Sequence, residues 1–266
     1  MSPRNARVET AFLVLVIVVG VAGFWNLYLG PNASPDGFHH LHLLTSFAWL
    51  GLLLLQVRMV GAGRVDLHRR FGRAVLALGP LLVASTALLS VRSASRWAGA
   101  SGGDPLLVQN AGVTIELGMV LLMAFLAIDR PRLHGAWLLS SALFFLGIAL
   151  VFTLVGFVPA FQPGGSDGMD GFVLAAITAS VVVVGFAVAL FARDVRNGWP
   201  YLLVAGVLVL NGFLGEVLRA NGAAATITRM IGGWNPYLTF AITFAILLGA
   251  LLLLGVGRTR RTRRVA

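Results

Sequence analysis

Long apolar runs separated by clusters of arginine limit most strongly what this chain can fold into. Eight such runs occur, at residues 10–29, 41–60, 74–92, 106–128, 133–158, 171–192, 200–219 and 237–257. Each is close to the roughly 20 residues that a helix needs to cross about 30 Å of hydrocarbon. None has the period-two alternation of a barrel strand. The sequence therefore predicts an all-α, polytopic transmembrane helix bundle of eight spans, formed by one membrane domain over residues 1–266.

The arginines predict how these spans are oriented. All 20 basic residues of the chain are arginine, and 16 of them lie in the two tails and in the alternate gaps at 58–73, 130–132 and 193–196. The other gaps hold only Arg92, Arg96, Arg219 and Arg229. Cytoplasmic loops carry the excess of Lys and Arg in membrane proteins. We therefore expect both termini on the cytoplasmic side of a bacterial inner membrane.

Composition excludes several classes of protein. With 58% hydrophobic and 11% charged residues, the chain has too little polar surface for a soluble globule of this length. Its net charge of +10 is spread over short clusters beside apolar runs, which favours contacts with anionic lipids over nucleic acid. The absence of cysteine excludes disulfides and thiolate metal sites. Membrane lipids, and possible further membrane-protein subunits, are the expected partners.

Local signals refine the expected helices and loops. Asp66 has the position of an N-cap, so the third helix is expected to begin several residues before its apolar run. The connection at 220–236 is rich in turn-forming residues and is expected to be a loop. Gly23 is among the small residues expected to allow close helix contact. The proline-broken helices common at transporter midplanes are not expected.

Polar residues inside the spans form a second group of candidates. Glu116 falls near the midplane of the fourth span, where a charge costs roughly 2.5–3.5 kcal/mol. Helical periodicity places Gln109 on the same face, with Asn110 adjacent. This stripe indicates either a proton or solute path or a hydrogen bond to another helix. Asn211 is a further candidate for an interhelical hydrogen bond, and Glu216 is expected to pair with Arg219.

A metal site is one interpretation of the outer end of the second span. His39 and His42 are three residues apart, on one face of a helix that starts early enough, and Asp36 closely precedes them. Imidazole and carboxylate together are ligands for zinc or copper. The alternative is a polar helix start at the membrane interface.

Spans two to five resemble a family of uncharacterised bacterial multi-span membrane proteins, a domain of unknown function. The resemblance rests on the histidines before span two, on Gln56-x-Arg58, and on Gly-Arg-x-x-Leu-His-Arg-Arg-x-Gly-Arg from Gly63 to Arg73. It also includes Leu133-His134 with Trp137 three positions on. The resemblance implies a membrane bundle with signature positions at His68, Arg69, Gly72, Arg73 and His134, and it implies no activity.

A more distant similarity to transmembrane b-type cytochromes implies a cofactor. Those proteins hold haem b between histidines on their third and fifth helices, often in a His-x-x-x-Gly sequence like that of His68 and Gly72. His68 and His134 both stand at cytoplasmic helix starts, so their side chains are expected within about 10–13 Å of each other. Arg69 and Arg73 would suit haem propionates, and arginine suits lipid phosphate equally well.

Three function classes follow from the sequence. The first is a haem-binding transmembrane redox protein, the second is a carrier of a small solute or of protons, and the third is a non-catalytic accessory or scaffold subunit of a membrane complex. Each uses different residues, so the positions of the polar side chains in the fold discriminate between them.

Overall fold

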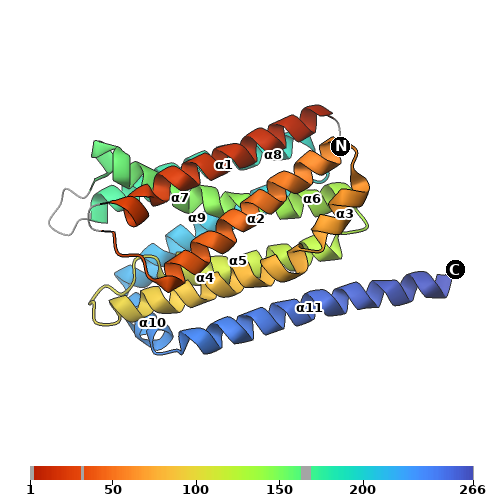
Figure 1. The fold of residues 1–266 in the computed structure, drawn as a ribbon. Helices are drawn as coiled ribbons and strands as arrows, with labels where there is room; N and C mark the ends of the chain where they lie inside the picture. Colours follow the sequence, from red (N-terminus) through yellow and green to blue (C-terminus); the bar gives the residue numbers. More distant parts are fainter. Residues whose placement is uncertain (1–2, 31–32, 163–168, 266) are drawn as a thin grey trace.

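A computed structural model describes residues 3–30, 33–162 and 169–265, and within these ranges the chain is helical and contains no strand (Figure 1). The gaps between the first and second predicted spans and between the fifth and sixth fall partly outside the described residues. The helices are α1 (Pro3–Leu29), α2 (Gly37–Gly61), α3 (Val65–Gly72), α4 (Val75–Trp97), α5 (Leu107–Leu126), α6 (Pro131–Ser140), α7 (Ala142–Phe157), α8 (Met169–Arg193), α9 (Trp199–Ala220), α10 (Ala223–Gly232) and α11 (Pro236–Val265), with a 3-10 turn, η1 (Pro159–Phe161).

Eight segments of the described chain are long and apolar enough to cross a membrane. They match the eight predicted spans in order, and the largest difference is at the third, which ends at Trp97 instead of residue 92. The predicted all-α polytopic bundle is confirmed. Both termini lie at one end of it, which we call the inner end, as an even number of spans requires (Figure 1).

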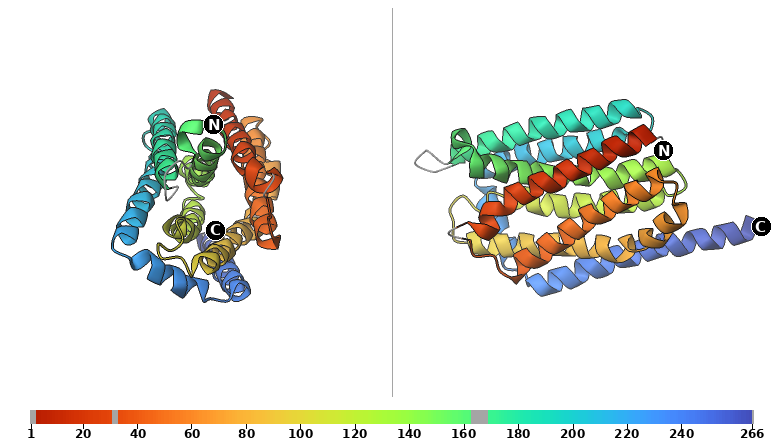
Figure 2. Two further views of the ribbon diagram at one scale, coloured as in Figure 1. Left: turned by 90° about the vertical axis from the view of Figure 1, so that its left-hand side faces the viewer. Right: turned by 45° about the horizontal axis from the view of Figure 1, so that its top comes forward.

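Seven spans form a closed ring, and the eighth lies outside it. Each helix packs on the next in the order α1, α2, α4, α5, α9, α8, α7, and α7 closes the ring against α1 (Figure 2). α6 and α7 belong to one span, and α6 packs on α5 and α9. α11 packs chiefly on α4. Consequently α4 is the most enclosed span and α11 is mainly exposed to lipid.

Packing is dense in the inner half of the ring. Trp49, Leu121 and Leu143 are completely buried and belong to one continuous apolar core. Towards the outer end of α1, close helix contact at the predicted glycine is confirmed as well, because a side chain at Gly23 would collide with the Ala149 carbonyl of α7. Without a hydrophobic driving force between helices in lipid, such backbone proximity supplies the van der Waals contact that holds a membrane bundle together.

Two spans are locally irregular, one near its inner end and one near its middle, but α4 continues through its proline, so no span in the described part of the chain is broken by proline, as expected. Pro80 lies inside α4, where it removes one backbone hydrogen bond. The fifth span is divided at Ser141, between α6 and α7. The hydroxyls of Ser140 and Ser141 donate to the carbonyls of Trp137 and Leu138, a pattern that bends helices. Both irregularities contact the same region, since Gly79 packs near Trp49 and Trp49 bonds Ser141.

Two connections also differ from expectation. Residues 65–72 form the separate short helix α3, and the residue at its N-cap position is Arg64, so Asp66 lies in the first turn instead of capping it. The connection at 220–236 contains the helix α10, which packs on α4 and α9. Ile231 and Thr228 of α10 are buried, so the apolar face of this helix closes part of the outer end.

The absence of cysteine makes the orientation directly testable. Ser101→Cys lies in the connection before α5, and Val195→Cys lies in the connection before α9, at opposite ends of the bundle. The arginine asymmetry predicts that a membrane-impermeant thiol reagent added to intact cells labels the first variant and leaves the second unlabelled. Labelling of both from outside, or of Val195→Cys alone, would contradict the predicted orientation.

Candidate functional site

A cavity of about 430 Å³, here called the ring cavity, occupies the outer half of the ring. Its wall is built from α1, α2, α4, α5 and α7. Most of that wall is apolar, with the aromatic rings of Phe24, Phe47, Phe144, Phe145 and Phe152. The size lies within the ~300–1,000 Å³ of pockets for small molecules. The ring cavity is therefore large enough for a small ligand with an apolar body.

The floor of the ring cavity is closed by the dense inner core. Leu50 and Leu117 line the cavity and belong to that core. Next to Leu50, the indole N–H of Trp49 donates to the Ser141 hydroxyl at 2.9 Å. This bond links α2 to the division in the fifth span. The ring cavity thus ends at the level where two of its wall helices are irregular.

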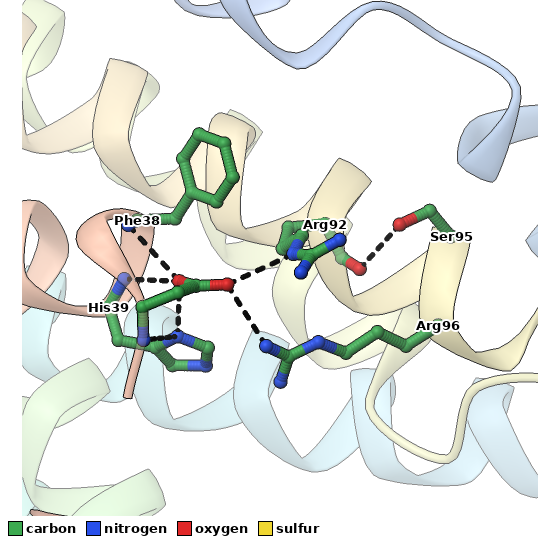
Figure 3. Close-up of polar contacts among 6 residues, drawn as sticks. Phe38, His39, Arg92, Ser95 and Arg96 are labelled. Carbon is green, nitrogen blue, oxygen red and sulfur yellow. Dashed lines mark hydrogen bonds and ion pairs between the residues drawn. The ribbon is translucent and has the colours of Figure 1, made fainter. Parts of the chain in front are cut away.

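An ion cluster centred on Asp36 lies at the mouth of the ring cavity, whose lining includes His39, Arg92 and Arg96. Figure 3 shows the contacts within this cluster. Asp36 caps α2, and its Oδ1 accepts from the backbone N–H groups of Phe38 and His39. The His39 ring lies 2.6 Å from the same oxygen. The Oδ2 of Asp36 accepts from Arg92 and Arg96, which lie one turn apart on α4, at 3.0 Å each. Asp36 therefore ties the start of α2 to the end of α4.

The mouth keeps an excess of positive charge. Burial alone would raise the pKa of Asp36, but hydrogen bonds from His39 and Arg92 outweigh it and hold the pKa well below its usual range. One ionised carboxylate thus faces two guanidinium groups. Arg92 and Arg96 both line the ring cavity, and their side chains are 38% and 44% exposed. They are accessible to an anionic group that enters from outside.

The three residues of the predicted metal site point to different partners. Asp36 and His39 are joined in the ion cluster, whereas His42 Nδ1 lies 3.4 Å from the Ser85 hydroxyl of α4. Ser85 also contacts the Thr45 hydroxyl at 2.8 Å. Among the described residues no group of three or more His, Asp or Glu is arranged to hold a metal ion. The three predicted ligands do not form a metal site, because Asp36 forms ion pairs with two arginines and His42 contacts the Ser85 hydroxyl.

The predicted polar stripe of the fourth span divides between two locations. Gln109 and Asn110 line the ring cavity. Glu116, further along α5, instead faces α9, where the Asn211 amide lies 2.9 and 3.0 Å from its two carboxylate oxygens. Gly112 leaves room for that amide, since an added side chain would lie 2.9 Å from Asn211 Nδ2. Of the two interpretations of Glu116, these contacts favour the interhelical hydrogen bond.

Substitutions at Glu116 test this role. Glu116→Gln keeps an oxygen that accepts from Asn211, so the free energy of unfolding should change by less than about 1 kcal/mol. Glu116→Leu leaves the Asn211 amide without its acceptor and should cost about 1–3 kcal/mol. Equilibrium unfolding in detergent compares the two variants. Equal destabilisation by both would show that the carboxylate charge, rather than the hydrogen bond, matters here.

Gln56 of α2 contacts the His68 part of the predicted inner site. With its amide oriented so that the oxygen accepts from the Gly72 N–H at 3.0 Å, its nitrogen donates to the carbonyl and to the Nδ1 of His68. Burial, His134 and Arg69 lower the pKa of His68. The separation of about 10–13 Å expected between the two imidazoles stays a prediction. Gln56 is itself buried, and it fastens α3 to α2.

The two histidines differ in how well they fit a haem iron. His134 Nδ1 lies 2.8 Å from the Ala124 carbonyl. This contact requires the Nδ1–H tautomer, the usual one for a histidine that ligates a metal through Nε2. His68 accepts from Gln56 at Nδ1, so its proton is on Nε2, which blocks ligation through that atom. Arg69 and Arg73 are exposed. The residues present therefore fit haem at one axial position and not at the other.

Comparisons with protein-family models, with curated proteins and with solved structures find no match to this chain. The resemblances stated from the sequence therefore stay predictions, and function is inferred from the geometry of the site.

Sequence reasoning missed the two residues that give the ring cavity its charge. Arg92 and Arg96 are two of the four arginines on the predicted outer side, where the positive-inside rule disfavours them. Their spacing of one helical turn places them on one face. An outer pair at this spacing is a signal for an anion partner, and the structure supplies Asp36 as one such partner.

The expected pair of Glu216 and Arg219 is confirmed as an ion pair within one turn of α9.

Proposed function

We propose that this multi-span membrane protein is a carrier for a small organic anion with an apolar body, which enters the ring cavity from the outer side. The observation that carries the proposal is the pairing of an aromatic-walled cavity with two arginines at its mouth. Arginine forms charge-assisted hydrogen bonds with carboxylate, sulfonate and phosphate groups. The head of the ligand would contact Arg92 and Arg96, and its body would lie among the phenylalanine rings.

The shape of the bundle supports transport of the anion rather than binding alone. The ring cavity opens to the outer end, and the inner half is closed by packed core, as in an outward-facing state. Helices with interrupted hydrogen bonding beside a central site are typical of secondary transporters. Pro80 and Ser141 supply such interruptions next to Trp49. We propose that opening towards the inner side takes place by bending at these two positions.

Three probes with the same tail test the ligand class. Octanoate, octanol and octylamine are titrated into the protein in lipid nanodiscs, and heat of binding is measured. We expect octanoate to bind about tenfold more tightly than octanol, and octylamine to bind most weakly, because the mouth carries excess positive charge. Equal binding of all three would reject the anion site. No binding of any would favour the accessory-subunit alternative.

A b-type haem redox protein is the second candidate. It is favoured by the positions of His68 and His134 in helices that begin at the inner end and by the tautomer of His134. Ligation at His68 would require the Gln56 amide to turn, so that Nδ1 carries the proton. The absorption spectrum of the purified protein, oxidised and then reduced, tests it. A Soret band lost on both His68→Ala and His134→Ala would establish haem, and a spectrum without one would reject it.

A further inference from the structure

A second cavity, the lateral cavity, adjoins the ring cavity across α5 and α7, where Leu106, Gln109 and Ile148 line both, and its lining does not include Arg92 or Arg96. It has a volume of about 560 Å³ and is lined by α5, α7, α8 and α9. Several of its wall residues are also strongly exposed on the outside of the bundle, among them Ile177, Val181, Val209 and Phe213. The cavity is therefore open sideways, where a membrane places the hydrocarbon of its lipids.

The outer end of the lateral cavity carries an unsatisfied carboxylate. Asp104 is only 4% exposed and lines the cavity. Its Oδ1 accepts from the Leu106 N–H at 2.8 Å, whereas its Oδ2 makes no hydrogen bond of good geometry in the described part of the chain, although the Ser93 hydroxyl is close enough to the carboxyl to lower its pKa. A buried, unpaired carboxylate oxygen is costly. A ligand that donates a hydrogen bond would remove this cost.

Contacts with α10 hold the backbone at Asp104 in place. Its backbone N–H donates to the Thr228 hydroxyl of α10 at 2.9 Å. The preceding residue, Gly103, has a positive φ of 71° and approaches the Ala224 backbone so closely that a side chain would lie 2.8 Å from it. The backbone that carries the carboxylate is thus held against α10 at the outer end of the bundle. Burial raises the pKa of Asp104, and the nearby Ser93 hydroxyl and the Leu106 N–H offset this only in part.

The outer end of the lateral cavity has an excess of negative charge, whereas the mouth of the ring cavity has an excess of positive charge. Asp104, Glu216 and Arg219 all line the lateral cavity, and Glu216 is already paired with Arg219. The remaining charge is that of Asp104. The cavity therefore combines an apolar wall open to hydrocarbon with an outer end that favours a positively charged hydrogen-bond donor.

We propose that the lateral cavity binds an outer-leaflet lipid with a primary ammonium head, as in phosphatidylethanolamine. One acyl chain lies against α8 and α9, and the ammonium donates to Asp104 Oδ2. A quaternary choline head has no N–H and cannot make this bond. The structure thus assigns a lipid selectivity that depends on Asp104 and is independent of Arg92 and Arg96.

Two lipids with identical acyl chains test the proposal on the delipidated full-length protein. Retention of phosphatidylethanolamine and phosphatidylcholine is measured by native mass spectrometry across a titration. We expect phosphatidylethanolamine to bind about tenfold more tightly to the wild type, and Asp104→Asn to remove most of that difference. Equal affinity for the two lipids in the wild type would overturn the proposal, as would an undiminished preference in Asp104→Asn.

Filling the cavity provides a variant that leaves Asp104 intact. Gly212 lines the lateral cavity, and a Cβ added there meets no atom within 4 Å, so Gly212→Leu should fold. The leucine should weaken the binding of both lipids because it fills the cavity. Gly185→Leu is the matched control, because Gly185 is exposed on α8, outside the cavity lining, with equally open space. Unchanged lipid binding in Gly212→Leu would place the lipid elsewhere and reject the site. Octanoate binding should persist in both variants, which separates this result from the proposed function.

Discussion

Replacing Arg92 and Arg96 together with methionine should weaken octanoate binding by about 30- to 150-fold. Each arginine offers a charge-assisted hydrogen bond, and because both are partly exposed we expect each to contribute about 1–1.5 kcal/mol after solvent screening. Methionine keeps the apolar bulk of the arginine stem at the mouth. The affinity for octanol, which lacks the charge, should change by less than about threefold. Calorimetric titration in nanodiscs gives both numbers.

Arg219→Met is the matched control for this prediction. Arg219 also lies on the predicted outer side and is also paired with a carboxylate, but it lines the lateral cavity instead of the ring cavity. Octanoate should bind this variant as tightly as it binds the wild type. A comparable loss in Arg219→Met would mean that general outer-surface charge, rather than the two arginines at the mouth, attracts the anion.

The second large effect is expected at the floor of the ring cavity. Trp49→Ala removes a completely buried side chain and the bond to Ser141, and it should lower the free energy of unfolding by about 3–5 kcal/mol. Trp49→Phe keeps most of the packing and loses the hydrogen bond, so about 1–2 kcal/mol is expected. Equilibrium unfolding in mixed micelles compares them. A loss below about 1 kcal/mol in Trp49→Ala would show that this region is not the tight closure described above.

The sequence predicted those parts of the fold that depend on local pattern. Span number, order and approximate bounds follow from runs of apolar residues, because the bilayer fixes the length that a helix must reach. Asn211 was recognised as an interhelical donor because an amide inside a span needs a partner. The ion pair of Glu216 and Arg219 was predictable because residues three apart on a helix are neighbours on its surface.

The arrangement of the helices around the ring could not be predicted, and the sites depend on it. Nothing local indicates that Asp36 would meet Arg92 and Arg96, which follow it by 56 and 60 residues. For the same reason Asp36, His39 and His42 looked like a metal site. The tautomer of His68 depends on Gln56 of another helix. Asp104 stands in a loop, and only the position of α10 shows that it is buried.

Access to the ring cavity from outside is the central claim, and a single cysteine tests it most directly. Asn110 lines the cavity and is partly exposed, so a reagent that enters the cavity can reach the thiol of Asn110→Cys. Impermeant methanethiosulfonates of similar size, one anionic and one cationic, are added to intact cells, and modification rates are measured.

We predict that the anionic reagent modifies this cysteine about tenfold faster than the cationic one, and that Arg92→Met with Arg96→Met removes the difference, because the two guanidinium groups concentrate anions at the mouth. Equal rates for the two reagents, or modification only after the inner side is exposed, would contradict the account.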